Sequence, residues 1–226
     1  MPRRPRVATG GYAYHVFNRA VGRWRIFRQD DDYAAFERTL ADVHRRLPTR
    51  LLSYCLMPNH WHLVLWPAAD GELSQFLRLL TVTHTQRWHA HYRTAGTGPL
   101  YQGRFKSFPI QMDEHLLMAC RYVERNALAA KLARRAEAWP WGSAAARRRH
   151  DRPAWLLGDE LWPVDRPRRW LAILNEPQSP MEESRLETSV KRGRPLGNDA
   201  WVMRTAAKLS LESTLRPRGR PKMERE

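Results

Sequence analysis

The chain has 226 residues, of which 39 are Lys or Arg and 23 are Asp or Glu, so its formal net charge is +16. This length suits one ordinary domain with an appendage, and so large a positive charge indicates a polyanionic partner. No stretch approaches the roughly twenty apolar residues of a membrane span, and no apolar secretory segment follows the basic N-terminus. Cys55 and Cys120 are the only cysteines and form no CxxC pair, which favours free thiols in the cytoplasm.

Residues 11–19 alternate aromatic and smaller side chains, which predicts a strand with His15 and Phe17 on the same face. Aspartates at 30–32 then offer an N-cap and a negative first turn. Apolar residues at helical spacing follow, so we predict a helix that Pro48 ends.

Residues 51–66 predict two short strands joined by a tight turn at Pro58 and Asn59. His60 and His62 come directly after the turn, two positions apart, so their side chains point to the same face of the strand. Two such imidazoles could bind one divalent metal. Two ordinary histidines on a half-solvated sheet face explain the pattern equally well.

A second amphipathic helix is predicted after Asp70, because apolar residues recur from Leu73 at steps of three and four. His84, His89 and His91 lie towards its end. No Cys or acidic ligands flank these histidines, so we interpret them as part of a solvated helix end and not as a second metal site.

A further strand is predicted near residues 103–111, where basic or polar residues alternate with apolar ones from Arg104 onward. This alternation puts Arg104 and Lys106 on the same face. Cations beside aromatic residues suit a nucleic-acid backbone with stacked bases, and an ordinary solvent-facing strand is the alternative.

The third helix is predicted over residues 113–130, with acidic residues at its start that suit the helix dipole. Tyr122 and Asn126 are four residues apart and therefore lie on one face, one turn from each other. Because residue 127 is Ala, we expect this helix to continue past Asn126.

Beyond residue 130 the pattern is less regular. Trp139 and Trp141 predict a hydrophobic lid on the core, and the arginines of residues 147–149 predict a solvated or phosphate-facing edge. Residues 177–189 are polar and predict a mobile linker. Two Gly-Arg-Pro segments follow, at 193–195 and 219–221, and a helix is predicted between them. The arginine of such an extended segment, Arg194 or Arg220, can enter a narrow minor groove.

The motif Met-Pro-Asn-His-Trp-His-Leu at residues 57–63 resembles the HUH signature (His, hydrophobic, His) of single-tyrosine transposases. More specifically, the chain resembles the REP-associated tyrosine transposases. Arg-Tyr-Val-Glu-Arg-Asn at residues 121–126 resembles the helix that carries the nucleophile, and both Gly-Arg-Pro segments resemble the C-terminal element. Ala127 departs from the family, which often has Pro after this Asn.

This resemblance implies an α+β fold with a ferredoxin-like central antiparallel sheet packed by helices. We expect a catalytic domain over residues 1–150 and a basic, DNA-gripping C-terminal extension over residues 151–226. The resemblance assigns the catalytic nucleophile to Tyr122. It also implies a Mg²⁺ or Mn²⁺ ion, with His60, His62 and Asn126 as its ligands. The residues expected to contact DNA are Arg104, Lys106, Arg194 and Arg220.

The implied activity is metal-dependent cleavage and rejoining of single-stranded DNA at palindromic hairpins through a 5′-phosphotyrosine. A covalent intermediate of this kind conserves the energy of the broken bond. Tyr101 is a rival nucleophile, but it precedes a strand and lacks a helical polar partner. The alternative function is a hairpin-binding protein or repressor with a vestigial site. A zinc-stabilised RNA-binding module is disfavoured, because it would need more cysteines.

We also expect single-stranded DNA hairpins as partners, no membrane association, and a cytoplasmic, nucleoid-associated location. A monomer is favoured over a dimer, because the C-terminal extension could cover the surface that a second copy would use.

Overall fold

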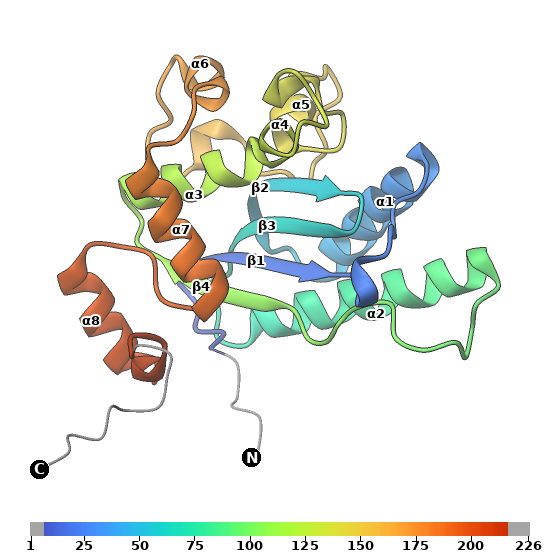
Figure 1. Cartoon of the computed structure of the whole chain (residues 1–226), viewed down its shortest axis with the longest axis horizontal. Helices are drawn as coiled ribbons and strands as arrows, with labels where there is room; N and C mark the ends of the chain where they lie inside the picture. Colours follow the sequence, from blue (N-terminus) through green and yellow to red (C-terminus); the bar gives the residue numbers. More distant parts are fainter. Residues whose placement is uncertain (1–6, 217–226) are drawn as a thin grey trace, which may run out of the picture.

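A four-stranded antiparallel sheet forms the centre of the protein, which is shown as a computed structural model with residues 7–216 described (Figure 1). Its strands lie in the order β2-β3-β1-β4. Their bounds are β1 (Ala13–Arg19), β2 (Arg50–Met57), β3 (His60–Trp66) and β4 (Lys106–Ile110).

Two helices connect these strands, α1 (Asp30–Arg46) and α2 (Glu72–Tyr92). The chain runs β1-α1-β2-β3-α2-β4, which with this strand order is the ferredoxin-like arrangement. The α+β prediction is therefore confirmed. The two strands predicted to carry His15 and the histidine pair, β1 and β3, are neighbours at the centre of the sheet.

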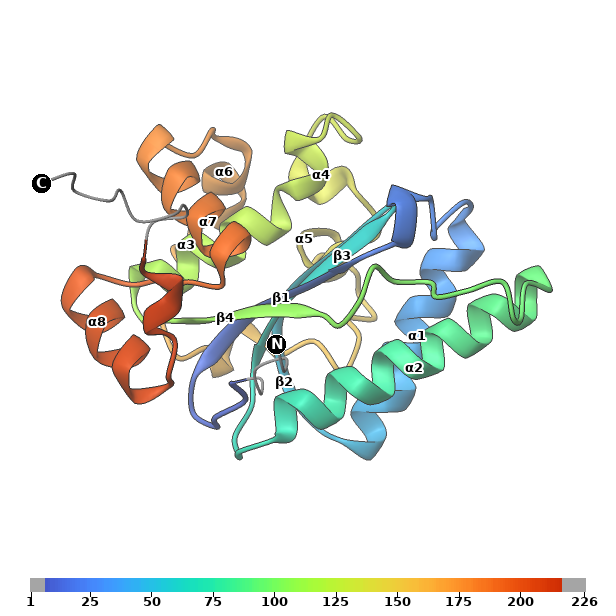
Figure 2. The ribbon, with the colours of Figure 1, turned by 60° about the horizontal axis from the view of Figure 1, so that its bottom comes forward.

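Helices cover both faces of the sheet (Figure 2). Helices α1 and α2 pack on one face, against side chains such as Trp61, Leu63 and Leu65 of β3. The other face holds α3 (Glu114–Glu124), whose Leu116 and Val123 share a second core with β2 and β4. The strict alternation of β3 decides which side chains enter each core.

The third helix is shorter than the sequence predicts. Helix α3 ends at Glu124, and a separate turn of helix, α4 (Asn126–Ala129), follows. Arg125 between them has φ −92° and ψ 4°, which departs from helical geometry and interrupts the ladder of hydrogen bonds. Our expectation that the helix would continue unbroken past Asn126 is wrong, and the absence of proline at position 127 is not sufficient to extend it.

The C-terminal third folds back onto the α3 face and shares its core. The helices that follow α4 are η2 (Ala136–Ala138), α5 (Ser143–Ala146), η3 (Asp159–Leu161), α6 (Trp170–Asn175), α7 (Pro180–Arg192), α8 (Asp199–Lys208) and η4 (Glu212–Thr214). One further short helix, η1 (Val21–Arg23), follows β1. Trp170, Leu174 and Leu186 of this part are buried in the same cluster as α3.

Both outer edges of the sheet are also covered by later parts of the chain. Leu156 forms a parallel bridge with Leu51 of β2, and Leu196 forms one with Ile110 of β4. The amide of Leu196 donates to the carbonyl of Pro109 at 2.9 Å.

The prediction of a mobile linker at residues 177–189 is wrong, because most of this segment lies in α7. Ser179 and Glu182 form a capping box, and Pro180 occupies the first helical position. The helix ends at Gly193, whose φ of 72° suits glycine. Leu186 is fully buried against the core, so the few apolar residues of the segment are sufficient to anchor it.

The hydrophobic lid predicted near residue 140 is present. Trp139 and Trp141 both pack against the core that lies under α1. The ring of Trp141 stacks on Tyr33 with 5.1 Å between centroids, and Trp139 Nε1 donates to the carbonyl of Leu56 at 2.9 Å.

Candidate active site

The two histidines of the HUH-like motif lie on the α3 face of the sheet, as the alternation of β3 predicts. Their ring centroids are 5.0 Å apart. In the pairing of β1 with β3, Phe17 lies opposite His62 and Arg19 opposite His60. The end of β1 therefore borders the histidine pair, which the sequence pattern alone does not reveal.

Each of the two histidines has its Nδ1 held by a neighbour. His60 Nδ1 lies 2.6 Å from Asn59 Oδ1, and His62 Nδ1 lies 2.8 Å from Nε2 of His15. The planes of the His15 and His62 rings are nearly parallel, with 8° between them. Both histidines are thus oriented through Nδ1, which leaves Nε2 of each ring to bind a ligand.

All three imidazoles are held in the neutral state. Burial lowers the pKa of His15 to about 3, and burial assisted by the charge of Arg19 lowers the pKa of His60 to about 4. The pKa of His62 lies well below its usual value, first through burial and then through its histidine neighbours. Neutral imidazole is the form that binds metal, so this donor set fits a divalent cation.

Tyr122 of α3 lies directly against this cluster. Its ring makes edge contacts with His62 and His15, at centroid distances of 5.9 and 5.8 Å. Burial raises the pKa of Tyr122, while a hydrogen bond with Asn126 and the charge of Arg19 act in the opposite direction. The structure therefore brings Tyr122, Asn126 and the two histidines of the motif into one region.

A pocket of about 610 Å³ opens beside Tyr122. Arg104 and Lys106, which were predicted to contact DNA, both line it. Strand β4 begins only at Lys106, so Arg104 lies in the preceding loop and not on the strand as predicted. The remaining lining residues are Phe17, Asn18, Arg19, Gln102, Gly103, Glu187, Val190 and Lys191.

Four residues of this region were not identified from the sequence. His15 and Arg19 come from β1, and Glu187 and Lys191 come from α7. The alternation of β1 places His15 and Arg19 on one face, but it does not say which strand lies beside them. Helix α7 follows more than fifty residues after Tyr122, so only the folded chain shows that it borders this pocket.

Of the two arginines of the Gly-Arg-Pro segments, one lies apart from this pocket and the other lies outside the described residues. Arg194 lines a separate pocket of about 250 Å³ near α7 and α8, with its Nη2 3.8 Å from Asp199 Oδ1. Arg220 lies beyond residue 216 and is not described.

Tyr101, the rival nucleophile, is a core residue on the opposite face of the sheet. Its hydroxyl accepts a hydrogen bond from Trp61 Nε1 at 3.0 Å and lies 2.6 Å from Nδ1 of His84. Burial raises its pKa well above the usual value. His84 is buried here and is not part of a solvated helix end, which corrects the sequence interpretation of this histidine.

Another group of potential metal ligands lies near the far end of α3. Asp113, Glu114 and His115 place their ligand atoms within 4.8 Å of one another, the only such trio within residues 7–216. Asp113 accepts hydrogen bonds from the amide and the ring of His115 and caps the helix. Tyr122 lies about 12 Å further along the helix axis, from the rise of ~1.5 Å per residue. A helix cap accounts for this trio.

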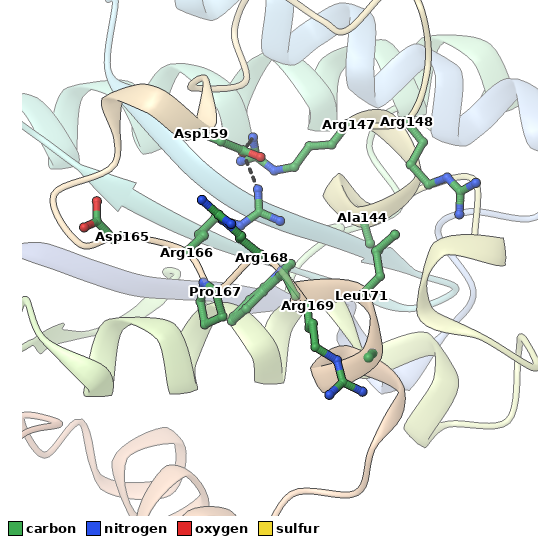
Figure 3. Close-up of a pocket in the computed structure, with 12 residues that line it drawn as sticks. Ala144, Arg147, Arg148, Asp159, Asp165, Arg166, Pro167, Arg168, Arg169 and Leu171 are labelled. Carbon is green, nitrogen blue, oxygen red and sulfur yellow. Dashed lines mark hydrogen bonds and ion pairs between the residues drawn. The ribbon is translucent and has the colours of Figure 1, made fainter.

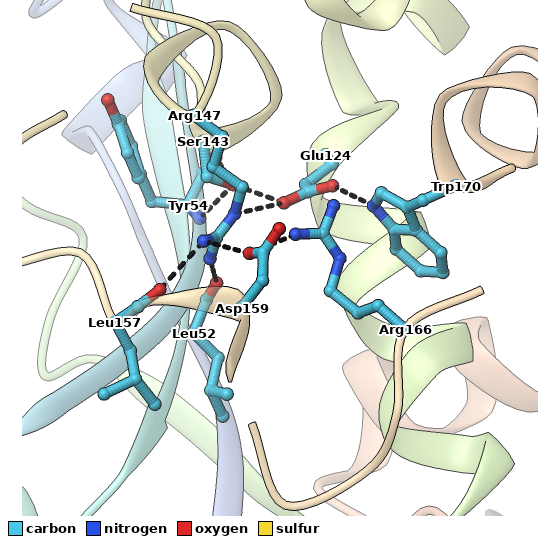
Figure 4. Close-up of polar contacts among 9 residues, drawn as sticks. All are labelled: Leu52, Tyr54, Glu124, Ser143, Arg147, Leu157, Asp159, Arg166 and Trp170. Atoms are coloured by element: carbon cyan, nitrogen blue, oxygen red, sulfur yellow. Dashed lines mark hydrogen bonds and ion pairs between the residues drawn. The ribbon is translucent and has the colours of Figure 1, made fainter. Parts of the chain in front are cut away.

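A buried network fixes the end of the helix that carries Tyr122 (Figure 4). The carboxylate of Glu124 accepts from Ser143 Oγ at 2.8 Å and from Trp170 Nε1 at 2.7 Å. Arg147 Nε lies 3.8 Å from the same carboxylate, and Arg147 Nη1 donates to Asp159 at 2.6 Å. Elements from three parts of the chain thereby meet behind α3.

Residues 8–126, more than half of the chain, match the family model described as "Transposase IS200 like". The chain belongs to this family. The matched residues of this IS200-like transposase include both histidines of the motif and Tyr122, and they end at Asn126.

Two solved structures resemble this transposase at low sequence identity, and the first has a TM-score high enough to indicate a shared fold. A REP-associated tyrosine transposase bound to a REP hairpin is 17% identical, with a TM-score of 0.53 over 70% of this chain and 93% of that one. A candidate transposase from Deinococcus radiodurans is 16% identical, with a TM-score of 0.40 over 58% of this chain and 95% of that one. No curated protein matches the sequence. None of the helices within residues 7–216 is long and apolar enough to cross a membrane.

Proposed function

We propose that this transposase cuts and rejoins single-stranded DNA next to palindromic hairpins, in the manner of the REP-associated group. The observation that carries the proposal is the position of Tyr122, whose ring contacts His62 while its pocket is lined by Arg104 and Lys106. The proposed nucleophile thus contacts a neutral imidazole pair and borders an opening lined by cationic side chains, which suits attack on a phosphodiester.

In the proposed reaction the Tyr122 hydroxyl gives up its proton to solvent, and its oxygen attacks the scissile phosphorus. The new Tyr–phosphorus bond replaces the bond to the 3′ oxygen, which takes up a proton and leaves as a free 3′-hydroxyl. The product is a 5′-phosphotyrosine, and the reverse attack by a 3′-hydroxyl rejoins the strand. The number of phosphodiester bonds is conserved, so this exchange needs no ATP.

The residues proposed to hold Mg²⁺ or Mn²⁺ are His60 and His62, through Nε2, and Asn126. When bound, such an ion would neutralise charge that develops on the phosphate. Arg19 contributes a fixed positive charge at the same place, where it favours both the phenolate of Tyr122 and an approaching phosphate.

Basic and aromatic residues continue from the Tyr122 pocket into a neighbouring pocket, where single-stranded DNA could bind. The pocket beside Tyr122 shares Phe17, Lys106 and Lys191 with a second pocket of about 920 Å³. Lys106 Nζ lies 5.9 Å from the ring centroid of Phe17. Aromatic faces beside ammonium groups suit stacked bases and backbone phosphates. We propose that Arg104 and Lys106 hold phosphates here, and that Arg194 and Arg220 contact DNA further along the C-terminal extension.

The test is incubation with a labelled single-stranded DNA hairpin in Mn²⁺ or Mg²⁺, resolved on a denaturing gel. We expect a covalent protein–DNA band that is absent with Tyr122→Phe and with His62→Ala. Tyr101→Phe is the matched control and should retain the band. Tight binding without an adduct, across several hairpins and both metals, would instead support a hairpin-binding protein or repressor with a vestigial site.

We further propose that the protein acts as a monomer in the cytoplasm, associated with the nucleoid, with residues 1–150 as the catalytic domain and residues 151–226 as its DNA-gripping extension. Sedimentation velocity should give the mass of a single chain. A stable dimer would contradict this part of the proposal.

A further inference from the structure

A second basic pocket, of about 610 Å³, lies on the α3 face of the sheet between α5 and α6 (Figure 3). No residue that lines it also lines the Tyr122 pocket. Its charged lining residues are Arg147, Arg148, Asp159, Asp165, Arg166, Arg168 and Arg169. The pocket lies entirely outside residues 8–126, the part that matches the family model.

Positive charge predominates in this pocket, with five arginines against two aspartates. Arg148, Arg168 and Arg169 are exposed, and their guanidinium groups make no hydrogen bond or ion pair within the described part of the chain. Arg148 follows α5 and Arg169 precedes α6, and in Figure 3 their side chains point away from the ion pairs at Asp159. Several uncompensated positive charges that line one pocket favour an anion there.

The other two arginines of the pocket are held in place by ion pairs. Arg147 and Arg166 both pair with Asp159, and the side chain of Arg147 is only 7% exposed. Nε of Arg147 and Nε of Arg166 are buried without a hydrogen-bond partner. Arg147 reaches the Glu124 carboxylate, which anchors α3 (Figure 4). Arg147 and Arg166 are therefore held rigidly against α3 with their charges balanced by Asp159 and Glu124, so the uncompensated positive charge comes from Arg148, Arg168 and Arg169.

We infer that this arginine pocket is a second DNA-binding site, which holds backbone phosphates of the hairpin stem while the scissile strand lies at Tyr122. The inference rests on the proposed function. Guanidinium groups match phosphate oxygens in geometry and charge. The pocket lies on the same face of the sheet as Tyr122, with α3 between the two openings, so one DNA molecule that extends past α3 can occupy both.

The contacts assigned here are to phosphates, so they position the DNA and do not read its sequence. Arg148, Arg168 and Arg169 would each neutralise one phosphate. Each such contact contributes about 0.9 to the slope of log K against log salt for duplex DNA.

The experiment measures the affinity of a fluorescent DNA hairpin that carries a single-stranded flank, over a series of salt concentrations. It uses the full chain with Tyr122→Phe, so that cleavage does not interfere. The pocket variant carries Arg148→Gln, Arg168→Gln and Arg169→Gln. We expect its affinity for the hairpin to fall by roughly 10- to 100-fold at physiological salt. The magnitude of the slope of log K against log salt should decrease by about 2 to 3.

The matched control carries Arg38→Gln, Arg46→Gln and Arg78→Gln. These arginines are exposed on α1 and α2, on the opposite face of the sheet, so the control removes the same three charges. We expect its affinity to fall less than about 3-fold. An equal loss of affinity in both variants would attribute binding to net charge and overturn the inference that this pocket binds DNA. Unchanged binding by the pocket variant would also overturn it.

The single-stranded flank alone distinguishes stem contacts from strand contacts. The pocket variant should bind it as tightly as its parent does, within about twofold. An equal loss for the flank and for the hairpin would overturn the assignment to the stem. Because binding is measured without cleavage, failure of this inference differs from failure of the proposed function, which would appear as a missing covalent adduct when Tyr122 is intact.

Discussion

At the scale of single residues, the site depends on side chains that support the predicted ones. The spacing of His60 and His62 on one strand predicts a pair of ligands, and the resemblance to the family predicts Tyr122 as the nucleophile. His15 could not be assigned in this way. It lies 47 positions from His62, and only the register of β1 against β3 brings Nε2 of His15 to 2.8 Å from Nδ1 of His62.

His15 should determine how tightly a metal binds. We expect His15→Leu to weaken Mn²⁺ binding by about 10- to 100-fold, because His62 loses the partner that orients its ring. His15→Gln should bind within about threefold of the native protein, because its amide oxygen can accept from His62 Nδ1–H. Isothermal titration with Mn²⁺ in the absence of DNA measures both. Equal affinities for the Leu and Gln variants would contradict this role.

Arg19 should control the pH at which Tyr122 reacts. Its charge lowers the pKa of Tyr122, which burial otherwise raises. Arg19→Gln removes that charge, so the pKa rises and the phenolate forms only at higher pH. We expect slower adduct formation at neutral pH and a rate profile displaced to higher pH. Single-turnover rates across a pH series test this, with the exposed Arg38→Gln as control. An unchanged profile would exclude the effect.

At the scale of elements, turn and cap chemistry was more informative than composition. The polar composition of residues 177–189 predicts a linker, yet Ser179, Pro180 and Glu182 carry the start signals of a helix. Those signals were available in the sequence and should have outweighed polarity. The break at Arg125 left no comparable signal in the sequence, and the Glu124 that precedes it bonds to Ser143 and Trp170, which lie far along the chain.

The buried contacts of Glu124 should contribute a large part of the free energy of unfolding. Glu124→Ala leaves Arg147 without its buried partner and removes acceptors for Ser143 and Trp170, so we expect a loss of about 3–5 kcal/mol in the free energy of unfolding. Glu124→Gln retains an acceptor and should lose less. Glu114→Ala, an exposed position on the same helix, should change stability by less than about 0.5 kcal/mol. Urea denaturation compares all three, and similar losses at the two positions would be inconsistent with an anchoring role.

At the scale of the whole molecule, the fold was predictable because the order of strands and helices is local information. The choice of faces was also predictable, since alternation in β3 separates Trp61 from His62. The path of the C-terminal third was not predictable. Residues such as Leu156, Leu186 and Leu196 show no periodicity from which their contacts could be predicted. Their positions follow from surface that the first 130 residues leave uncovered.

Buried neutral histidines should make the protein sensitive to acid. The pKa of His84 is lowered to about 3 by burial, whereas the unfolded chain takes up this proton near 6.5. Its contribution to stability is therefore complete above about pH 6.5 and is lost as the pH falls towards about 3. His84→Gln can keep the contact with Tyr101 but does not titrate. We expect the slope of unfolding free energy against pH, measured below pH 6, to fall by about 1.4 kcal/mol per pH unit. An unchanged slope would argue against a neutral, buried His84.

The bridges made by Leu156 and Leu196 have a consequence for behaviour at high concentration. An antiparallel sheet normally ends in strands whose free amides and carbonyls can recruit another polypeptide. Here the outer sides of β2 and β4 are already partly occupied by the protein's own chain. Growth of the sheet by addition of foreign strands, the first step towards fibrils, is thereby obstructed at both ends, and colloidal stability does not depend on charge repulsion alone.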